Sequence, residues 1–318
     1  MVRWGKPLKT IDIVTSAYNE EECLPELFRR LRGVFALESQ YSFRVLIADN
    51  GSIDNTWKII SEEAIQDPRI LGFRMSRNFS LDAAFTNGLD NATGNAVVIM
   101  TSDLQDPPES ISALLRKYEE GFDQVVVKVI SRNSVPLLRR MLSKIFYRVA
   151  NKMTSGLLPE SVSDFRLVSR KTYIAIRSLR ESHRFLRGLG AWVGFKTGEI
   201  EIARPPRFAG QSNWLGLSLV KVTSQASKSL LAYSAKPLAW VSTIGLLLSA
   251  STCLGIFVLS IFWLTYGVPF AGYGSLIGVM FVGFSVIMLC IGILAQYLGL
   301  IYEEVKQRPL YVVSEKTF

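Results

Sequence analysis

The sequence is poor in the residues that form disulfides and bind zinc. Its 318 residues include three cysteines and one histidine, His183. Cys253 and Cys290 lie in long apolar stretches, and Cys23 lies near a predicted helix start, so no pair has the spacing of a metal site. These absences argue against a disulfide scaffold and against a zinc-dependent class. We expect His183, in a strongly charged segment, to be a surface residue.

Two common glycine-rich motifs for phosphate binding are also missing. The chain has no Gly-x-x-x-x-Gly-Lys-Ser/Thr, and no Gly-x-Gly-x-x-Gly follows a predicted strand. The glycines of Gly188-Leu-Gly190 have a different spacing, and we interpret them as loop packing. A P-loop nucleotide hydrolase and a Rossmann dehydrogenase are therefore disfavoured.

Charged residues are absent from two consecutive stretches near the C-terminus, Leu238–Tyr266 and Gly267–Tyr302. Each stretch exceeds the roughly 20 apolar residues that cross a bilayer core, and the turn at 266–274 separates them. Lysines and arginines flank the pair but are missing from the turn, which predicts that both chain ends are cytoplasmic. We expect a multi-pass protein of the inner (plasma) membrane.

This pattern predicts four regions along the chain. They are a cytoplasmic α/β domain (1–214), an amphipathic interfacial helix region (215–236), two transmembrane helices (237–302) and a cytoplasmic tail (303–318). The net charge of +9 arises entirely before the spans. A basic domain beside a membrane favours anionic lipids and phosphate-bearing substrates, and no nucleic-acid recognition motif is present.

Two further patterns suggest contacts at the membrane. A basic amphipathic helix is predicted over 135–154, either as an ordinary surface helix or facing anionic headgroups. Small residues four apart in the spans, as in Gly274-Ser-Leu-Ile-Gly278, allow close helix packing and favour a homo-oligomer.

The first part of the chain alternates between strand and helix patterns. Strands are predicted at 10–16, 43–48, 70–75, 96–100 and 123–130, with helices at 23–35, from 57, and at 83–92. This alternation predicts a mostly parallel sheet covered on both faces. Three of the strands end in polar loops, which should meet at one edge of the sheet, where ligands bind in such folds.

The most informative of these loops follows the apolar run Val97–Met100. It contains Asp103, Gln105 and Asp106, whose oxygens suit Mg²⁺ or Mn²⁺ bridging a diphosphate. The same residues also fit a helix start, with Asp106 as N-cap and Glu109 three residues later. In a second loop, the carboxylate of Asp49 can accept the N–H of a uracil or guanine ring.

Six short motifs occur in order and resemble those of glycosyltransferase family two. They are Tyr18-Asn-Glu-Glu21, Asp49-Asn-Gly-Ser-Ile-Asp54, Ser76-Arg-Asn-Phe79, Ser102-Asp-Leu-Gln-Asp-Pro-Pro-Glu109, Ser163-Asp-Phe-Arg166 and Arg204-Pro-Pro-Arg-Phe-Ala-Gly-Gln-Ser212. With two C-terminal spans, the chain is most similar to the polyprenyl-phosphate branch, which includes dolichol-phosphate mannose synthases and bacterial undecaprenyl-phosphate glucosyltransferases.

The resemblance implies a GT-A fold and a set of site residues. It places the nucleotide against Ala17, Tyr18, Glu20, Asp49 and Ser102, and the metal at Asp103 and Gln105. It gives catalytic roles to Asp103, Asp164 and Arg166, and acceptor-phosphate roles to Arg132, Arg166, Arg204, Arg207 and Ser212. Asp164 could instead be a structural cap of its loop. Thr101 stands where the family usually has Asp, so one expected carboxylate on the metal side is missing.

The resemblance implies inverting transfer of a sugar from a nucleotide-sugar, with UDP-glucose favoured, to undecaprenyl phosphate. GDP-mannose or a modified sugar are alternative donors. A processive polysaccharide synthase is a second alternative, but the chain has no Gln-x-x-Arg-Trp motif. A third is a non-catalytic scaffold or flippase subunit, although spans without charge offer a sugar headgroup no polar path.

Overall fold

The computed structural model describes residues 8–130, 162–182, 184–209 and 273–318, with scattered positions between 238 and 266. It divides into two compact units, Met1–Val222 with Pro309–Phe318, and Thr223–Arg308. The predicted helix over 135–154, the interfacial region at 215–236, Arg132, His183 and Ser212 lie outside the described residues.

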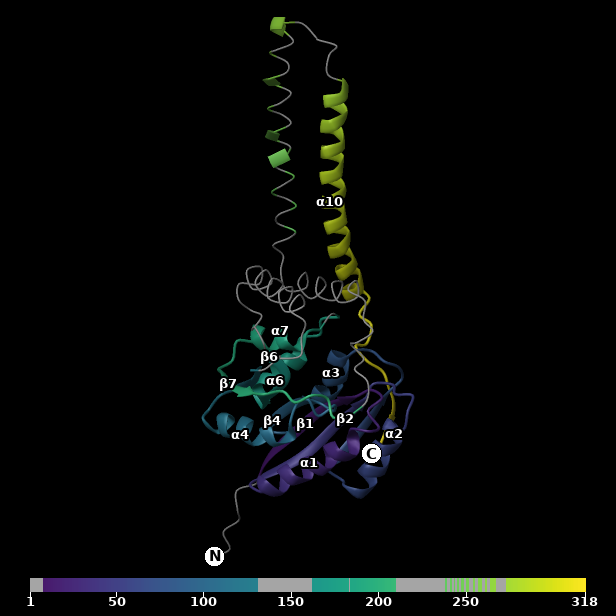
Figure 1. The fold of residues 1–318 in the computed structure, drawn as a ribbon, viewed down its shortest axis with the longest axis vertical. Helices are drawn as coiled ribbons and strands as arrows, with labels where there is room; N and C mark the ends of the chain where they lie inside the picture. Colours follow the sequence, from purple (N-terminus) through teal and green to yellow (C-terminus); the bar gives the residue numbers. More distant parts are fainter. Residues whose placement is uncertain are drawn as a thin grey trace, which may run out of the picture. The chain divides into compact units, whose positions relative to one another are not determined.

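The first unit is built on an eight-stranded mixed sheet (Figure 1). Its strands are β1 (Lys9–Ala17), β2 (Tyr41–Asp49), β3 (Ile70–Met75), β4 (Ala96–Thr101), β5 (Gln124–Val129), β6 (Val162–Ser169), β7 (Thr197–Ile202) and β8 (Val313–Lys316). They are ordered β7-β5-β6-β4-β1-β2-β3-β8. The central strands β4, β1, β2 and β3 are mutually parallel, and β6 and β8 run antiparallel to their neighbours.

Helices pack against this sheet because their apolar residues recur at helical spacing. They are α1 (Leu24–Leu37), α2 (Thr56–Gln66), α3 (Leu81–Asn91), the short 3-10 helix η1 (Pro108–Ser110), α4 (Ile111–Glu119), α6 (Arg170–Ser178) and α7 (Leu186–Trp192). One face of α1 buries Leu24, Leu27 and Leu31 in a core shared with β1 and β2. The side chain of Ser80 caps α3 by accepting a hydrogen bond from the Ala83 N–H at 3.1 Å.

The five strands expected from the sequence are confirmed to within about two residues at each end, and the α/β fold with them. Two local interpretations were wrong. Gly188 and Gly190 lie in helix α7, not in a loop. A Cβ at Gly190 would come within 2.8 Å of both Arg166 Nη1 and Gln124 Oε1, so close packing explains the small residue. Asp106 does not cap a helix either, because Pro107 holds the N-cap position of η1.

The C-terminal residues return to the first unit. Strand β8 pairs antiparallel with β3 and forms one edge of the sheet. The Ser76 N–H donates to the Val312 carbonyl at 2.9 Å, and the Tyr311 hydroxyl donates to Asp90 of α3 at 2.8 Å. No local pattern in the sequence predicted this strand.

The second unit contains α10 (Tyr273–Val305). Its segment Val279–Val305 contains an 18-residue window with a mean hydropathy of 2.3 and is long and apolar enough to cross a membrane. It is the one helix of this kind within the described residues. It corresponds to the second predicted span, whereas the first lies largely outside the part of the chain that the structure describes.

Candidate functional site

The ends of three parallel strands meet at one edge of the sheet. Ala17 at the end of β1 is paired in register with Asp49 at the end of β2. On the other side of β1, Ser16 is paired with Thr101 at the end of β4. The loops that follow therefore lie side by side, as the sequence predicted, and adjacent strands are about 4.8 Å apart. The Ser102 hydroxyl ties two of these ends together by donating to the Ser16 carbonyl at 2.7 Å.

Hydrogen bonds also join the first two loops. The Asn19 N–H donates to Ser52 Oγ at 2.9 Å, and the Glu20 N–H donates to Thr56 Oγ1 at 2.8 Å. The chain reverses at Gly51, whose φ of +77° is open to glycine but strained for other residues. A Cβ there would lie 2.6 Å from the Arg77 carbonyl carbon. These contacts join the first two of the three loops at this edge (18–23, 50–55 and 102–107), which together are called the rim below.

Asp49 is fully buried beneath this rim, and its two oxygens differ. Oδ1 accepts the Ser52 N–H at 2.9 Å, whereas the buried Oδ2 has no hydrogen bond within the described residues. The nearest cation is Arg74, whose Nε lies 3.7 Å from Oδ2. Burial raises the pKa of Asp49, and Ser52 and Arg74 offset part of that rise. An acceptor of this kind, buried but unsatisfied, is suited to an N–H of a ligand.

The loop after β4 is organised by two carboxylates. Asp103 Oδ1 accepts the Thr101 hydroxyl at 2.7 Å and the Gln105 N–H at 3.1 Å. Asp106 accepts both the N–H and the hydroxyl of Thr101, at 3.1 and 2.8 Å. Between them, Leu104 has a φ of +60°, an uncommon conformation for a branched residue. Thr101, at the position where the resemblance leads us to expect Asp, thus has its hydroxyl within hydrogen-bonding distance of the carboxylates of both Asp103 and Asp106.

The donor set of this loop fits a divalent cation bound jointly with a substrate. No group of three or more acidic, His or Cys side chains suited to a metal occurs among the described residues. Asp103 and Gln105 would contribute oxygens, and Mg²⁺ in nucleotide sites commonly takes its remaining ligands from phosphates and water. Asp103 and Gln105 could therefore hold a divalent cation only together with ligands from outside this loop.

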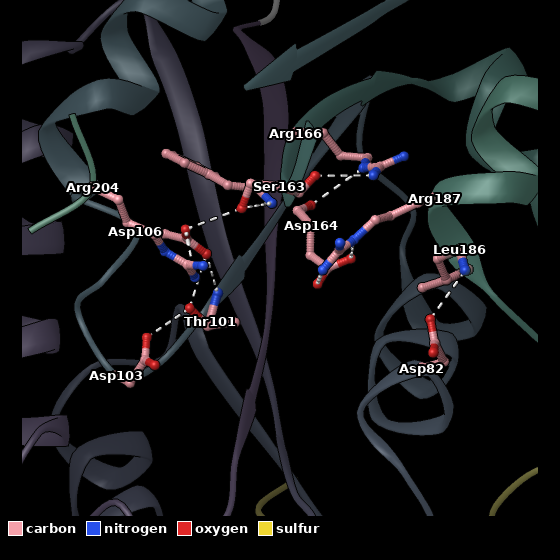
Figure 2. Close-up of polar contacts among 11 residues, drawn as sticks. Asp82, Thr101, Asp103, Asp106, Ser163, Asp164, Arg166, Leu186, Arg187 and Arg204 are labelled. Carbon is pink, nitrogen blue, oxygen red and sulfur yellow. Dashed lines mark hydrogen bonds and ion pairs between the residues drawn. The ribbon is translucent and has the colours of Figure 1, made fainter. Parts of the chain in front are cut away.

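The segment 204–209, which contains Arg204 and Arg207, contacts the acidic residues of the rim (Figure 2 shows Arg204). Arg204 pairs with Asp106 at 3.2 Å, and Arg207 donates to both oxygens of Glu20 at 2.7 Å. The Phe208 N–H approaches the Asp103 carbonyl at 3.5 Å. Burial raises the pKa of Glu20, and the charge of Arg207 counteracts it. Arg207, predicted for the acceptor, thus lies beside Glu20, which was predicted for the nucleotide, and Arg204 lies beside Asp106 of the loop after β4.

A second charged cluster lies next to this rim and includes Asp164 and Arg166 of β6 (Figure 2). Asp164 accepts two hydrogen bonds from Arg187, at 2.6 and 2.5 Å. Burial alone would raise the pKa of Asp164, but the charge and hydrogen bonds of Arg187 hold it below its usual value. Asp82, at the start of α3, accepts the Leu186 N–H at 3.0 Å, and burial raises its pKa to about 6.

Arg166 differs from the other predicted acceptor arginines. Its side chain is 2% exposed and donates to the carbonyls of Ser163 and Asp164 at 3.1 and 3.2 Å. Burial lowers the pKa of Arg166 to about 10. Within this cluster, Arg166 hydrogen-bonds the backbone of its own strand β6. The partner of the Asp164 carboxylate is Arg187, which was not predicted from the sequence. No motif in the sequence distinguishes Arg187 from other surface arginines.

The structure therefore gathers most of the predicted site residues at one edge of the sheet. The nucleotide-side set (Ala17, Tyr18, Glu20, Asp49, Ser102), the metal-side set (Asp103, Gln105) and the arginines Arg204 and Arg207 lie on or beside adjoining strand ends. The carboxyl edge of the parallel strands is where open α/β sheets generally bind their ligands, so this edge is the candidate site.

Comparison with known proteins identifies the family. The sequence profile of Glycosyl transferase family 2 matches residues 12–177. The chain is 34% identical to the uncharacterized glycosyltransferase YkcC of Bacillus subtilis, over 95% of this chain and 93% of that protein. It is 35% identical to the bactoprenol glucosyl transferase of Shigella phage SfII, over 96% and 97% of the two chains. The protein belongs to glycosyl transferase family 2 and is a glycosyltransferase.

Among solved structures, the glucosyl-3-phosphoglycerate synthase of Mycobacterium tuberculosis is similar with a TM-score of 0.47. The two chains are 18% identical, and the match covers 71% of this chain and 80% of that one.

Proposed function

We propose that this protein transfers a hexose, with inversion, from UDP-glucose to a polyprenyl phosphate at the cytoplasmic face of a membrane. The observation that carries the proposal is the meeting of the acidic rim with Arg204 and Arg207 at one sheet edge. Relatives similar over nearly the whole chain are named bactoprenol glucosyl transferases, which supports the same donor and acceptor classes.

The donor half of the site is proposed to recognise the nucleotide through Asp49 and its diphosphate near Asp103. The free Oδ2 of Asp49 would accept a ring N–H of the base. A divalent cation, Mg²⁺ or Mn²⁺, held with Asp103 and Gln105 would neutralise charge on the leaving diphosphate. Hydrogen bonds from the Thr101 hydroxyl and the Gln105 N–H orient the carboxylate of Asp103, which would contribute an oxygen to that cation.

On the acceptor side, the site has to bind the negative charge of the lipid phosphate rather than supply a general base. A phosphate monoester has a second pKa near 6 and is mostly ionised at neutral pH, so no side chain has to remove a proton. Guanidinium groups bind phosphate through paired N–H donors. Arg204 and Arg207, held by Asp106 and Glu20, would share these donors with an incoming lipid phosphate. Direct attack on the anomeric carbon then inverts its configuration.

The position of β8 supports an even number of membrane crossings. Strand β7 precedes the apolar stretches in the chain and β8 follows them, and both strands belong to the same sheet. If α10 crosses a bilayer once, the segment before it must cross too, because both ends return to the same sheet. The uncharged stretch at 238–266 has the length required. Basic residues on the flanks favour the cytoplasm for the catalytic domain.

Release of UDP from UDP-glucose, measured with and without polyprenyl phosphate, tests the proposal. We expect release to require both the lipid phosphate and a divalent cation, and to be abolished by Asp103→Ala. Glu22→Ala is the matched control, since Glu22 is an exposed carboxylate near the same rim. Full activity of Asp103→Ala would contradict the metal role. UDP release at the same rate without lipid phosphate would contradict polyprenyl phosphate as the acceptor. A preference for GDP-mannose would show that UDP-glucose is not the donor.

A further inference from the structure

The C-terminal strand is joined to the sheet beside the nucleotide half of the site. The Gly72 N–H donates to Thr317 Oγ1 at 2.9 Å, and the Thr317 N–H donates back to the Gly72 carbonyl at 3.2 Å. The Ser314 hydroxyl donates to the Arg74 carbonyl at 3.1 Å. These bonds fix the register of β8 on β3.

That register produces a row of charges across three strands. Asp49 of β2 is paired with Arg74 of β3, and Arg74 is paired with Glu315 of β8. Side chains at paired positions lie on the same face of a sheet and are close enough to interact. Arg74 therefore stands between a buried carboxylate on one side and the C-terminal strand on the other.

Glu315 makes two directed contacts from its position in this row. Its Oε1 accepts Arg74 Nη1 at 2.8 Å, and its Oε2 accepts the indole N–H of Trp57 at 3.1 Å. The Arg74 guanidinium also lies 5.9 Å from the centre of the Trp57 ring. The carboxylate of Glu315 thus contacts Arg74 with one oxygen and Trp57 with the other, in an ion pair that is partly exposed to solvent.

The other end of the guanidinium faces Asp49 without completing a hydrogen bond. Nε of Arg74 lies 3.7 Å from Oδ2 of Asp49, the oxygen that has no hydrogen bond within the described residues. An acceptor and a cationic donor set thus stand side by side at the rim. Nucleobases that carry an N–H next to a carbonyl, as uracil does, present the complementary pair.

We propose that Glu315 is a positioning residue for nucleotide binding, holding Arg74 beside Asp49 so that the two can meet the base together. This inference rests on the proposed nucleotide-sugar function. It makes the last strand, which follows the apolar helix α10 in the chain, part of the donor site. A simpler role, in which β8 only covers the edge of β3, predicts that any loss of β8 contacts has the same effect.

The test measures UDP binding by calorimetry with the full chain in detergent and Mn²⁺ present. We expect Glu315→Gln to weaken UDP binding about three- to tenfold, the range of a coupled charge contact, and Glu315→Asp to recover part of the loss. Thr317→Val removes the hydroxyl that accepts the Gly72 N–H and is the matched control for attachment of the strand. It should lower the melting temperature while leaving UDP affinity within about twofold, and Glu62→Gln on α2 should change neither.

In turnover assays, Glu315→Gln should raise the KM for UDP-glucose and leave the KM for polyprenyl phosphate unchanged. Unchanged UDP affinity in Glu315→Gln would overturn the assignment, as would an equal loss in Thr317→Val. If the wild-type protein binds UDP but transfers no sugar to polyprenyl phosphate, the proposed acceptor is contradicted. The role of Glu315 in UDP binding is not affected by that outcome. Wild-type protein that binds neither UDP nor GDP would contradict the proposed function and this inference together.

Discussion

Replacing Asp82 with Asn is expected to stabilise the α/β domain at neutral pH. Burial and the neighbouring charge of Asp164 raise the pKa of Asp82 from 3.8 to about 6. Because the folded chain binds this proton more tightly, the stability that Asp82 contributes is full below about pH 4 and is lost as the pH rises through about 6. At about 1.36 kcal/mol for each pKa unit, the upper bound is about 3 kcal/mol. The side chain is only half-buried, so we expect about 1–2 kcal/mol.

The melting temperature of the detergent-solubilised chain between pH 4.5 and 8 measures this effect. Asn has nearly the shape of Asp, and its carbonyl oxygen can still accept the Leu186 N–H. The excess of the variant over the wild type should be small near pH 4.5 and grow to several degrees at pH 7.5, at about 2–4 °C for each kcal/mol. Glu62→Gln serves as an exposed control. A variant that melts below the wild type at pH 7.5 would refute the reasoning, since Asp82 would then be a needed anion for Arg187.

Three further outcomes follow from the site. Arg187→Met leaves Asp164 without its bidentate partner, and we expect a loss of about 2–3 kcal/mol in unfolding free energy, partly recovered by adding Asp164→Asn; an unchanged melting temperature would contradict this. Gly51→Ala should cost about 1–3 kcal/mol and weaken UDP binding, because the residue has φ +77° and faces the Arg77 backbone at 2.6 Å; calorimetry and thermal melting check both effects. Chelation by EDTA should stop UDP release and added Mn²⁺ should restore it, and release that persists in EDTA would exclude the metal.

Local patterns predicted the central sheet well because each strand is an apolar run closed by turn residues. Register then brought Asp49 and the β4 loop to one edge, as parallel pairing requires. The C-terminal strand escaped prediction for a different reason. Thr317 contacts Gly72 across 245 positions of the chain, and no local periodicity encodes such a pairing. Arg187 escaped for the same reason, since its partner Asp164 is set by the packing of α7 on β6.

Charge balance at the rim bears on the cation. Of the four carboxylates Glu20, Asp49, Asp103 and Asp106, three face an arginine within the described residues: Glu20 faces Arg207, Asp49 faces Arg74 and Asp106 faces Arg204. Asp103 is the exception among these four, since its contacts are to a hydroxyl and a backbone N–H. A nucleoside diphosphate would bring further negative charge to the same edge. Repulsion between that diphosphate and Asp103 would oppose binding unless a cation lies between them, so among these four carboxylates Asp103 is the one at which the proposed divalent ion would matter most.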